Sequence, residues 1–305
     1  MSISQLPSGD EIFLDHVGHF VPDIAAAEQA LQRCGFQPTP FSVQVAPAGP
    51  DGALAPTGTG NVCAMLAAGY LEILAKTADT PIGRELDAGL ARWSGLHLAA
   101  FAVADAEAAN ARLAQAGFPM RPLVRMRRPV ETEAGMAEAR FTVSRIEAGV
   151  MQEGRIQMLT HHTEDAVWQQ RWMGHPNGVT GLLSLLIASG APEEAGRRFA
   201  RFFGLEPQSS DGGLTFPLSR GSVHICAPAK ANALVGAPPG LPWLAAYGLT
   251  VADLAVVEDL VRDAELQPVR RGRAVVTPFP PALGRGFWFF VEDARDLPWL
   301  EALDW

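Results

Sequence analysis

Apolar runs and helix-forming segments follow one another in a repeating order along the chain. The stretches 16–23 and 97–105 each begin as a short apolar run and end in an Asp. Ala-rich segments follow, and a Gly-Phe pair comes next at 35–36 and 117–118. Asp is a favoured helix N-cap, and Gly is favoured where a helix ends. Each stretch is therefore predicted to form a strand, a helix and then a further strand.

The same units close with matching segments. The stretches 69–74 and 154–159 alternate in the way a half-buried strand does. The first half thus contains two copies of a unit about 80 residues long. The second half repeats the strand, helix and closing strand more weakly, at 182–188, 193–203 and 221–226, and again at 249–253, 254–265 and 286–291. We predict four β-α-β-β-β modules.

The length and composition of the chain predict two domains. The chain has 305 residues, of which 48% are hydrophobic and 19% charged. Such a chain is long for one hydrophobic core, because single cores stop growing at about 250–300 residues. Together with the repeat, this predicts an N-terminal domain at 1–160, a connecting segment at 161–178 and a C-terminal domain at 179–305.

Charge and cysteine usage limit the classes of partner. The net charge of −9 and the pI of about 5.3 argue against a nucleic acid, because phosphate binding needs clustered Lys and Arg. Cys34, Cys63 and Cys226 form no CxxC pair and lie in apolar stretches, which favours buried, reduced thiols. There is no basic leader segment and no run of about 18 apolar residues. We expect a cytoplasmic protein that does not bind or cross a membrane.

A doubled β-α-β-β-β unit with His near the end of its first strand and Glu within its last resembles the vicinal-oxygen-chelate superfamily. Glyoxalase I, extradiol dioxygenases, fosfomycin-resistance enzymes and bleomycin-binding proteins belong to it. The segments 69–74, 154–159 and 160–168 are most similar to bacterial glyoxalase-like domain proteins. The resemblance covers essentially the whole chain. It implies an α+β fold of the glyoxalase, bleomycin-resistance and dioxygenase type, with four modules in two paired-module domains.

The resemblance also implies a metal site. Metal ligands in this superfamily come from the first and last strands of each module, and the matching residues are His16, Glu72, His97 and Gln157. Two imidazoles, a carboxylate and an amide oxygen suit Zn²⁺, Ni²⁺, Fe²⁺ or Mn²⁺. Gln157 departs from patterns with a second Glu and removes a potential carboxylate base. The alternative is that these polar residues are inherited by a metal-free binding protein, or are hydrogen-bonded groups of the core.

The C-terminal pair of modules lacks such a set. The positions that match the first-strand histidines fall near Leu182 and Ala245, and the two closing strands offer His224 and Phe289. A single His does not make a metal site. We therefore expect this pair to be structural or to enclose the substrate.

The function expected from the resemblance is a metal-dependent glyoxalase-like enzyme of the lyase or isomerase type. It would act on a small, anionic, oxygen-chelating substrate through a metal-stabilised enolate, with Glu72 and Gln157 as catalytic groups. One alternative is a non-haem Fe(II) dioxygenase, and another is a metal-free protein that binds or sequesters a small molecule. The expected partner is a small molecule, and a homodimer is compatible with the sequence.

Two further groups are candidates for substrate binding. Arg125, Arg127 and Arg128 form the densest basic run in an acidic chain, and guanidinium groups bind carboxylate or phosphate bidentately. Alternatively, the run pairs with neighbouring glutamates on a solvated loop. His161 and His162 follow a closing strand directly, where one could act as an acid or base at the mouth of the site. Alternatively, both are hydrogen-bonded linker residues.

Overall fold

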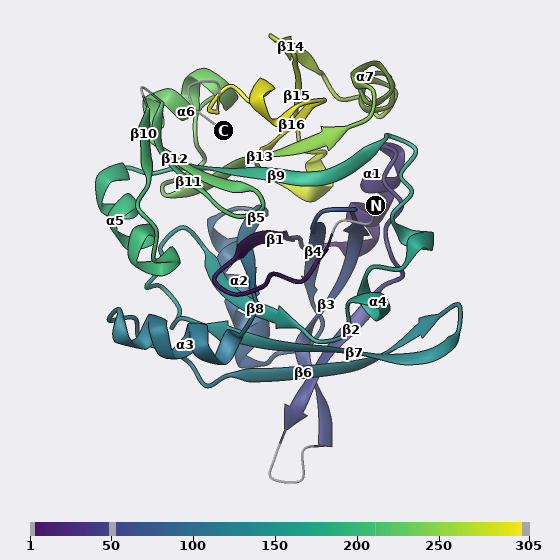
Figure 1. Ribbon diagram of the computed structural model, residues 1–305. Coiled ribbons are helices and arrows are strands. Elements are labelled where there is room, and N and C mark those ends of the chain that lie inside the picture. The colour runs from purple at the N-terminus through teal and green to yellow at the C-terminus, as the bar shows by residue number, and fades with distance from the viewer. Residues whose placement is uncertain (1–3, 49–52, 211, 301–305) are drawn as a thin grey trace.

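The computed structural model describes residues 4–48, 53–210 and 212–300, and its strands form two eight-stranded sheets (Figure 1). The first sheet has the order β2-β3-β4-β1-β5-β8-β7-β6 and the second the order β10-β11-β12-β9-β13-β16-β15-β14. The strands of the first sheet are β1 (Ile12–Phe20), β2 (Ser42–Ala48), β3 (Ala53–Met65), β4 (Tyr70–Lys76), β5 (Gly95–Val103), β6 (Val124–Thr132), β7 (Gly135–Arg145) and β8 (Arg155–His161). Those of the second are β9 (Val179–Ala188), β10 (Gln208–Ser210), β11 (Gly213–Pro217), β12 (Ser222–Cys226), β13 (Trp243–Val251), β14 (Val269–Arg271), β15 (Ala274–Pro278) and β16 (Phe287–Val291).

Each module contributes one strand, one helix and three further strands, so the predicted fold class is confirmed. Within a module the first and last strands are parallel neighbours, as β1 and β4 are, and the two first strands of a pair are antiparallel, as β1 and β5 are. The second sheet repeats the same order strand for strand. Whether residues 1–160 and 179–305 are independent domains stays a prediction.

The module helices begin where the sequence predicts. Asp23, Asp105 and Asp253 cap the helices α1 (Ile24–Arg33), α3 (Ala106–Gln115) and α7 (Leu254–Asp263), and each carboxylate accepts at least one hydrogen bond from a backbone N–H group of the first turn. The other helices are α2 (Pro81–Arg92), α4 (Glu164–Val167), α5 (Pro192–Phe203), α6 (Pro228–Val235) and the 3₁₀ turns η1 (Gln170–Trp172), η2 (Pro281–Leu283) and η3 (Ala294–Asp296). None of the helices in the described part of the chain is long and apolar enough to cross a lipid bilayer.

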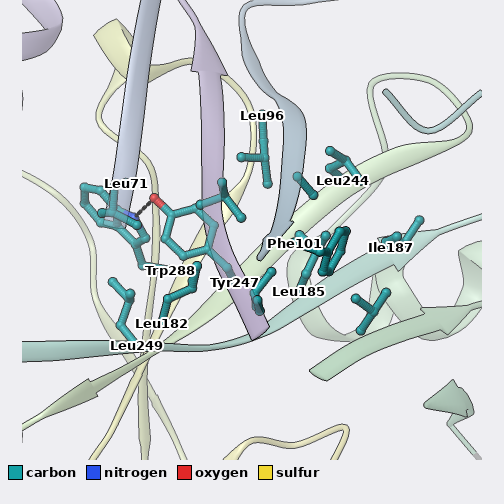
Figure 2. Close-up of a cluster of buried hydrophobic side chains, with 14 of the residues drawn as sticks. Leu71, Leu96, Phe101, Leu182, Leu185, Ile187, Leu244, Tyr247, Leu249 and Trp288 are labelled. Carbon is teal, nitrogen blue, oxygen red and sulfur yellow. Dashed lines mark hydrogen bonds between the residues drawn. The ribbon is translucent and has the colours of Figure 1, made fainter. Parts of the chain in front are cut away.

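The largest core lies between the two sheets. Figure 2 shows Leu71 and Phe101 of the first sheet beside Leu182 and Leu185 of the second, and Trp288 donates a hydrogen bond to the Tyr247 hydroxyl, 2.6 Å away. These side chains are almost completely buried. Each sheet thus turns one face toward the other sheet, and its opposite face lies away from this core.

A buried ion pair joins the two halves. Glu153, in the turn before β8, accepts a hydrogen bond from Arg198 of α5, and the side chains are 0% and 7% exposed. Removing one partner of a buried pair leaves the other charge without compensation in a medium of low polarity. The pair therefore makes the contact between the halves sensitive to a single substitution.

Arg198→Met is expected to lower the free energy of unfolding by about 3–5 kcal/mol, because Glu153 would stay buried without its cation. Arg262→Met is the matched control, since Arg262 is 55% exposed in its pairs on α7, and its expected cost is below about 1 kcal/mol. Urea denaturation of both variants measures the two values. Equal losses would contradict the assignment of Arg198 as a buried partner.

Candidate functional site

The other face of the first sheet lines a cavity of about 480 Å³. Of the four predicted metal ligands, His16 of β1, Glu72 of β4 and Gln157 of β8 lie in its lining. Two cationic side chains, Arg145 and Arg155, line it as well. Polar groups from four strands of the first sheet therefore line one cavity, whereas much of the remaining wall is apolar.

A buried carboxylate, that of Asp15, is hydrogen-bonded to His16. The Asp15 Oδ2 atom lies 2.7 Å from His16 Nδ1, and Asp15 Oδ1 lies 3.1 Å from His161 Nε2. Burial alone would raise the pKa of Asp15, but the charge and hydrogen bond of His161, together with those of His16, hold it well below its usual range. An ionised Asp15 accepts the Nδ1–H of His16. With Nδ1 as the donor to Asp15, the other ring nitrogen, Nε2, lies 3.6 Å from Glu72 Oε2.

This arrangement revises the expectation for His161 and His162. His161 is buried and bound to Asp15, so it supports His16 instead of lying at the mouth of the cavity. His162 lies 2.8 Å from the Thr142 hydroxyl through Nε2 and is exposed. Neither imidazole is among the residues that line the cavity. Their expected contact with a substrate is therefore not supported by this geometry.

Glu72 is a buried carboxylate whose two oxygens differ. Its Oε1 atom accepts hydrogen bonds from Asn61 Nδ2 at 2.6 Å and from Gln44 Nε2 at 3.0 Å. Gln44 is held in turn by the Thr59 hydroxyl. The Oε2 atom lies 3.6 Å from His16 Nε2. Glu72 therefore contributes one negative charge to the cavity, close to the imidazole.

The side-chain oxygen of Gln157 already accepts a hydrogen bond from a neighbouring cation. Arg145 Nε donates a hydrogen bond to Gln157 Oε1 at 3.2 Å. Burial, and next the charge of Arg155, lower the pKa of Arg145 to about 10, so the guanidinium stays charged at neutral pH. Arg155 is paired with Glu85 at 3.2 Å, but no carboxylate of the described residues lies within 4.0 Å of Arg145. Arg145 is thus a cation in the wall of the cavity without an anionic partner.

His97 does not join the other three predicted ligands. It lines a second cavity, its Nε2 lies 2.6 Å from the Trp93 carbonyl oxygen, and its ring stacks on the Trp93 indole. Burial lowers the pKa of His97 to about 4, so the imidazole is neutral. The predicted convergence of four ligands on one point is therefore wrong.

The reason is an offset of one residue in the predicted alignment of the two first strands, because His97 is equivalent to Asp15 and not to His16. In the pairing of β1 with β5, His16 lies opposite Ala100 and Gly18 lies opposite Leu98, and the register shifts on either side of these pairs. Asp15 and His97 are the extra, bulged residues of the two strands. Leu98, which lines the first cavity, is therefore the true counterpart of His16. Such a slip carries a side chain to a different environment.

The remaining donors do not fit a resident divalent cation. His16 Nε2 and Glu72 Oε2 are two strong donors, but the Gln157 amide already accepts from Arg145 and Leu98 has no donor atom. Protein metal sites of the expected kind use three or four ligands. Within residues 4–48, 53–210 and 212–300, no cluster of three or more His, Cys, Asp or Glu side chains could hold a metal ion. The nearby Arg145 charge also opposes a cation.

The three arginines of the basic run at 125–128 do not share one environment. Arg127 lies in the lining of the cavity, whereas Arg125 is exposed and pairs with Glu107 at 2.5 Å. The Arg128 side chain lies outside the described residues. Asp15, Arg145 and Arg155 were not predicted as site residues. A sequence signal existed for Asp15, because it is a lone acidic residue inside the apolar strand β1, but nothing local marks the two arginines.

The equivalent face of the second sheet is filled by the protein itself. By strand register the positions that match the first-sheet set are Ser184, His224, Ala246 and Phe289. This corrects the expected Leu182 and Ala245 by two residues and by one. Trp299 packs into this face and donates a hydrogen bond from Nε1 to Ser184 Oγ, 2.9 Å away. The C-terminal segment thus occupies the place that the cavity takes at the first sheet.

Comparison with known proteins supports the fold. Among solved structures, a hypothetical protein from Staphylococcus aureus matches with a TM-score of 0.64 and 10% identity, covering 92% of this chain and 98% of its own. A mutant of 4-hydroxymandelate synthase from Streptomyces coelicolor matches with a TM-score of 0.53 and 14% identity, covering 92% of both chains. These identities show a shared fold only.

Sequence comparison is more specific. A search of curated protein sequences finds no match. A family model described as the glyoxalase-like domain matches residues 14–203, which include the whole first sheet from Leu14 onward and the beginning of the second. The chain therefore belongs to the glyoxalase-like domain family, within the vicinal-oxygen-chelate superfamily.

Proposed function

We propose that the first cavity binds a small organic anion, and that His16 exchanges a proton with it without a resident metal ion. The observation that carries this proposal is Arg145, a partly buried guanidinium in the cavity wall whose only hydrogen-bond partner among the described residues is the neutral Gln157 amide. A buried cation is stabilised by an anion at hydrogen-bonding distance. A carboxylate is the group that matches a guanidinium in shape and charge.

The rest of the lining favours an amphipathic ligand. Phe41, Met126, Phe141 and Trp172 line the same cavity as the polar group around His16. A volume of about 480 Å³ lies within the range of small-molecule sites, which are mainly apolar with a few orienting polar groups. The ligand class supported is a carboxylate with a compact apolar or aromatic body.

The proposed chemistry is proton transfer at a carbon atom next to a carbonyl group. Asp15 would keep the lone pair of His16 on Nε2, as an orienting carboxylate does for a catalytic histidine. His16 Nε2 would take the proton from carbon, and the electron pair of the broken C–H bond would form an enolate. Arg145 would stabilise the enolate charge. Return of the proton to another atom completes an isomerisation, and loss of a neighbouring group completes an elimination.

The other functions considered from the sequence differ in what they require. A non-haem iron dioxygenase needs a triad of two histidines and one carboxylate, and Leu98 stands where the second histidine would be. A protein that only binds or sequesters its ligand needs Arg145 but not the lone pair of His16. Substitution of His16 therefore separates binding alone from proton transfer.

Glu72→Gln separates the anion site from a metal site. It removes the negative charge nearest His16 but keeps an oxygen that can accept from Asn61 and Gln44. We expect this variant to bind a small carboxylate roughly tenfold more tightly, because a like charge leaves the cavity. Metal content by elemental analysis should be substoichiometric in both proteins. The measurement is isothermal titration calorimetry on protein purified without chelators.

Glu193→Gln is the matched control for this substitution, since Glu193 is exposed on α5, in the other half of the chain. It should change neither affinity nor metal content. If the first cavity were a metal centre, Glu72→Gln would instead lose both metal and ligand, because Glu72 would supply the anionic ligand of the cation. That result would overturn the proposed function.

A further inference from the structure

A second cavity, of about 220 Å³, lies beside the first. Its walls come from α2 and from the segment 146–154 that joins β7 to β8. Arg145 and Arg155 line both cavities, so the two guanidinium groups stand at the boundary between them. Nothing in the proposed chemistry uses the second cavity.

The lining of the second cavity is rich in positive charge, although the whole chain is acidic. Four arginines line it, and they face only two carboxylates. Glu85 pairs with Arg121 at 2.6 Å and with Arg155 at 3.2 Å, and Glu147 pairs with Arg121 at 3.2 Å. His97 is the remaining titratable group of the lining, and burial lowers its pKa to about 4, so it adds no charge. The lining therefore keeps an excess of two positive charges.

Two of the four guanidinium groups have no carboxylate partner in the described chain. Arg145 donates to the Gln157 amide. Arg92, which is exposed, donates to the backbone carbonyl oxygens of Gln152 and Pro242. Guanidinium groups bind tetrahedral oxyanions through paired N–H donors. A cavity of this size matches a small oxyanion better than a drug-sized organic ligand.

We infer that the second cavity binds a small oxyanion of the phosphate class, with Arg92, Arg121 and Arg145 as its cationic contacts. Because Arg145 and Arg155 also line the first cavity, occupation of the second cavity weakens anion binding in the first. Only this coupling rests on the proposed function, since the second site itself requires no ligand in the first cavity. By linkage, each anion lowers the affinity for the other by the same factor.

The test is a titration of the full-length protein with inorganic phosphate, followed by calorimetry. Saturable binding is expected, and Arg92→Gln should weaken it about fivefold, as for an exposed charge pair. Ala88→Met should weaken it at least as much, because Ala88 is an exposed lining residue of α2 and a longer side chain fills the mouth without removing charge. Arg273→Gln, an 82% exposed arginine of the second half, should have no effect.

Glu85→Gln is expected to strengthen phosphate binding, so this test does not rely on a variant that loses binding. It removes the carboxylate shared by Arg121 and Arg155, so phosphate should bind about tenfold more tightly. A purely structural ion-pair network predicts lower thermal stability for this variant without any gain in affinity. Absence of saturable phosphate binding, or the same affinity in Arg92→Gln, Ala88→Met and the wild type, overturns the site.

Titration with glycerol 3-phosphate identifies the source of the anion. Tighter binding than inorganic phosphate supports a phosphorylated metabolite at the site, and weaker binding supports the free anion. The coupling is measured separately, by titrating a small carboxylate with and without saturating phosphate. Carboxylate binding that phosphate leaves unchanged overturns the coupling. Absence of carboxylate binding even without phosphate contradicts the proposed function and leaves the phosphate result standing.

Discussion

Arg145→Gln is expected to weaken the binding of small carboxylates by about ten- to a hundredfold. The substitution removes a charge-assisted hydrogen bond, which contributes about 1.5–3 kcal/mol, and each 1.4 kcal/mol corresponds to a factor of ten. Glutamine retains a donor for the Gln157 oxygen, so the wall of the cavity should keep its hydrogen bond. Stability should rise or stay unchanged, because a partly buried cation without an anionic partner is removed.

A panel of paired probes makes this measurement specific. Aromatic and branched aliphatic carboxylates are compared with their neutral amides, first by thermal shift and then by calorimetry. The wild type should prefer the carboxylate of each pair, and Arg145→Gln should lose that preference. Arg127→Gln is the comparison, because Arg127 lines the same cavity but is more exposed. Its effect on carboxylate binding should be smaller and should diminish as salt is added. A preference for carboxylates that survives in Arg145→Gln would remove the basis of the proposed function.

His16→Gln is expected to lower the rate of proton transfer by about 10²–10⁴-fold, the usual contribution of a general base. Glutamine can donate to Asp15 and can fill a similar volume, but its amide cannot take up a proton near neutral pH. The readout is deuterium exchange in D₂O, followed by proton NMR, at the carbon next to the carbonyl of the tightest-binding oxo-carboxylates. The Kd for the same compound should change much less than the exchange rate.

His162→Gln is the matched control for His16, since His162 is exposed and lies outside the cavity lining. It should exchange at the wild-type rate. If neither the wild type nor the control promotes exchange above solvent but both bind carboxylates, the protein is a binder and the proton-transfer part of the proposal fails. If His16→Gln exchanges as fast as the wild type, another group is the base.

The module order followed from short-range signals. Asp23, Asp105 and Asp253 each cap a helix because a carboxylate accepts from nearby N–H groups within one turn. Gly35 and Gly117 follow helices with φ of +78° and +85°, a conformation that Gly adopts without a steric cost. These interactions are local, so the residue types at fixed spacing were enough to predict them. The four-module fold could be predicted for the same reason.

The predicted site depended on how the first strands of the two modules are aligned. Aligning His16 with His97 is wrong by one residue, because Asp23 and Asp105, like Gly35 and Gly117, are 82 residues apart, and that spacing matches His16 with Leu98. The pairing of β1 with β5 gives the same correspondence, and an offset of one residue changes which side chains reach the cavity. Glu72 and Gln157, which lie opposite Gly18 and Ala100, were placed correctly in the cavity lining.

The sequence by itself determined the repeated modules, the fold class, the family resemblance and four of the residues that line the cavity. Each of these is encoded by side chains close to one another along the chain or by whole-module similarity. Tertiary structure alone decided the charge of the site. Arg145 reaches Gln157 across neighbouring strands, and Asp15 meets His161, 146 residues away. It also decided that Trp299 fills the second sheet's face. Such contacts join distant segments, so their energies enter only when the sheets have formed.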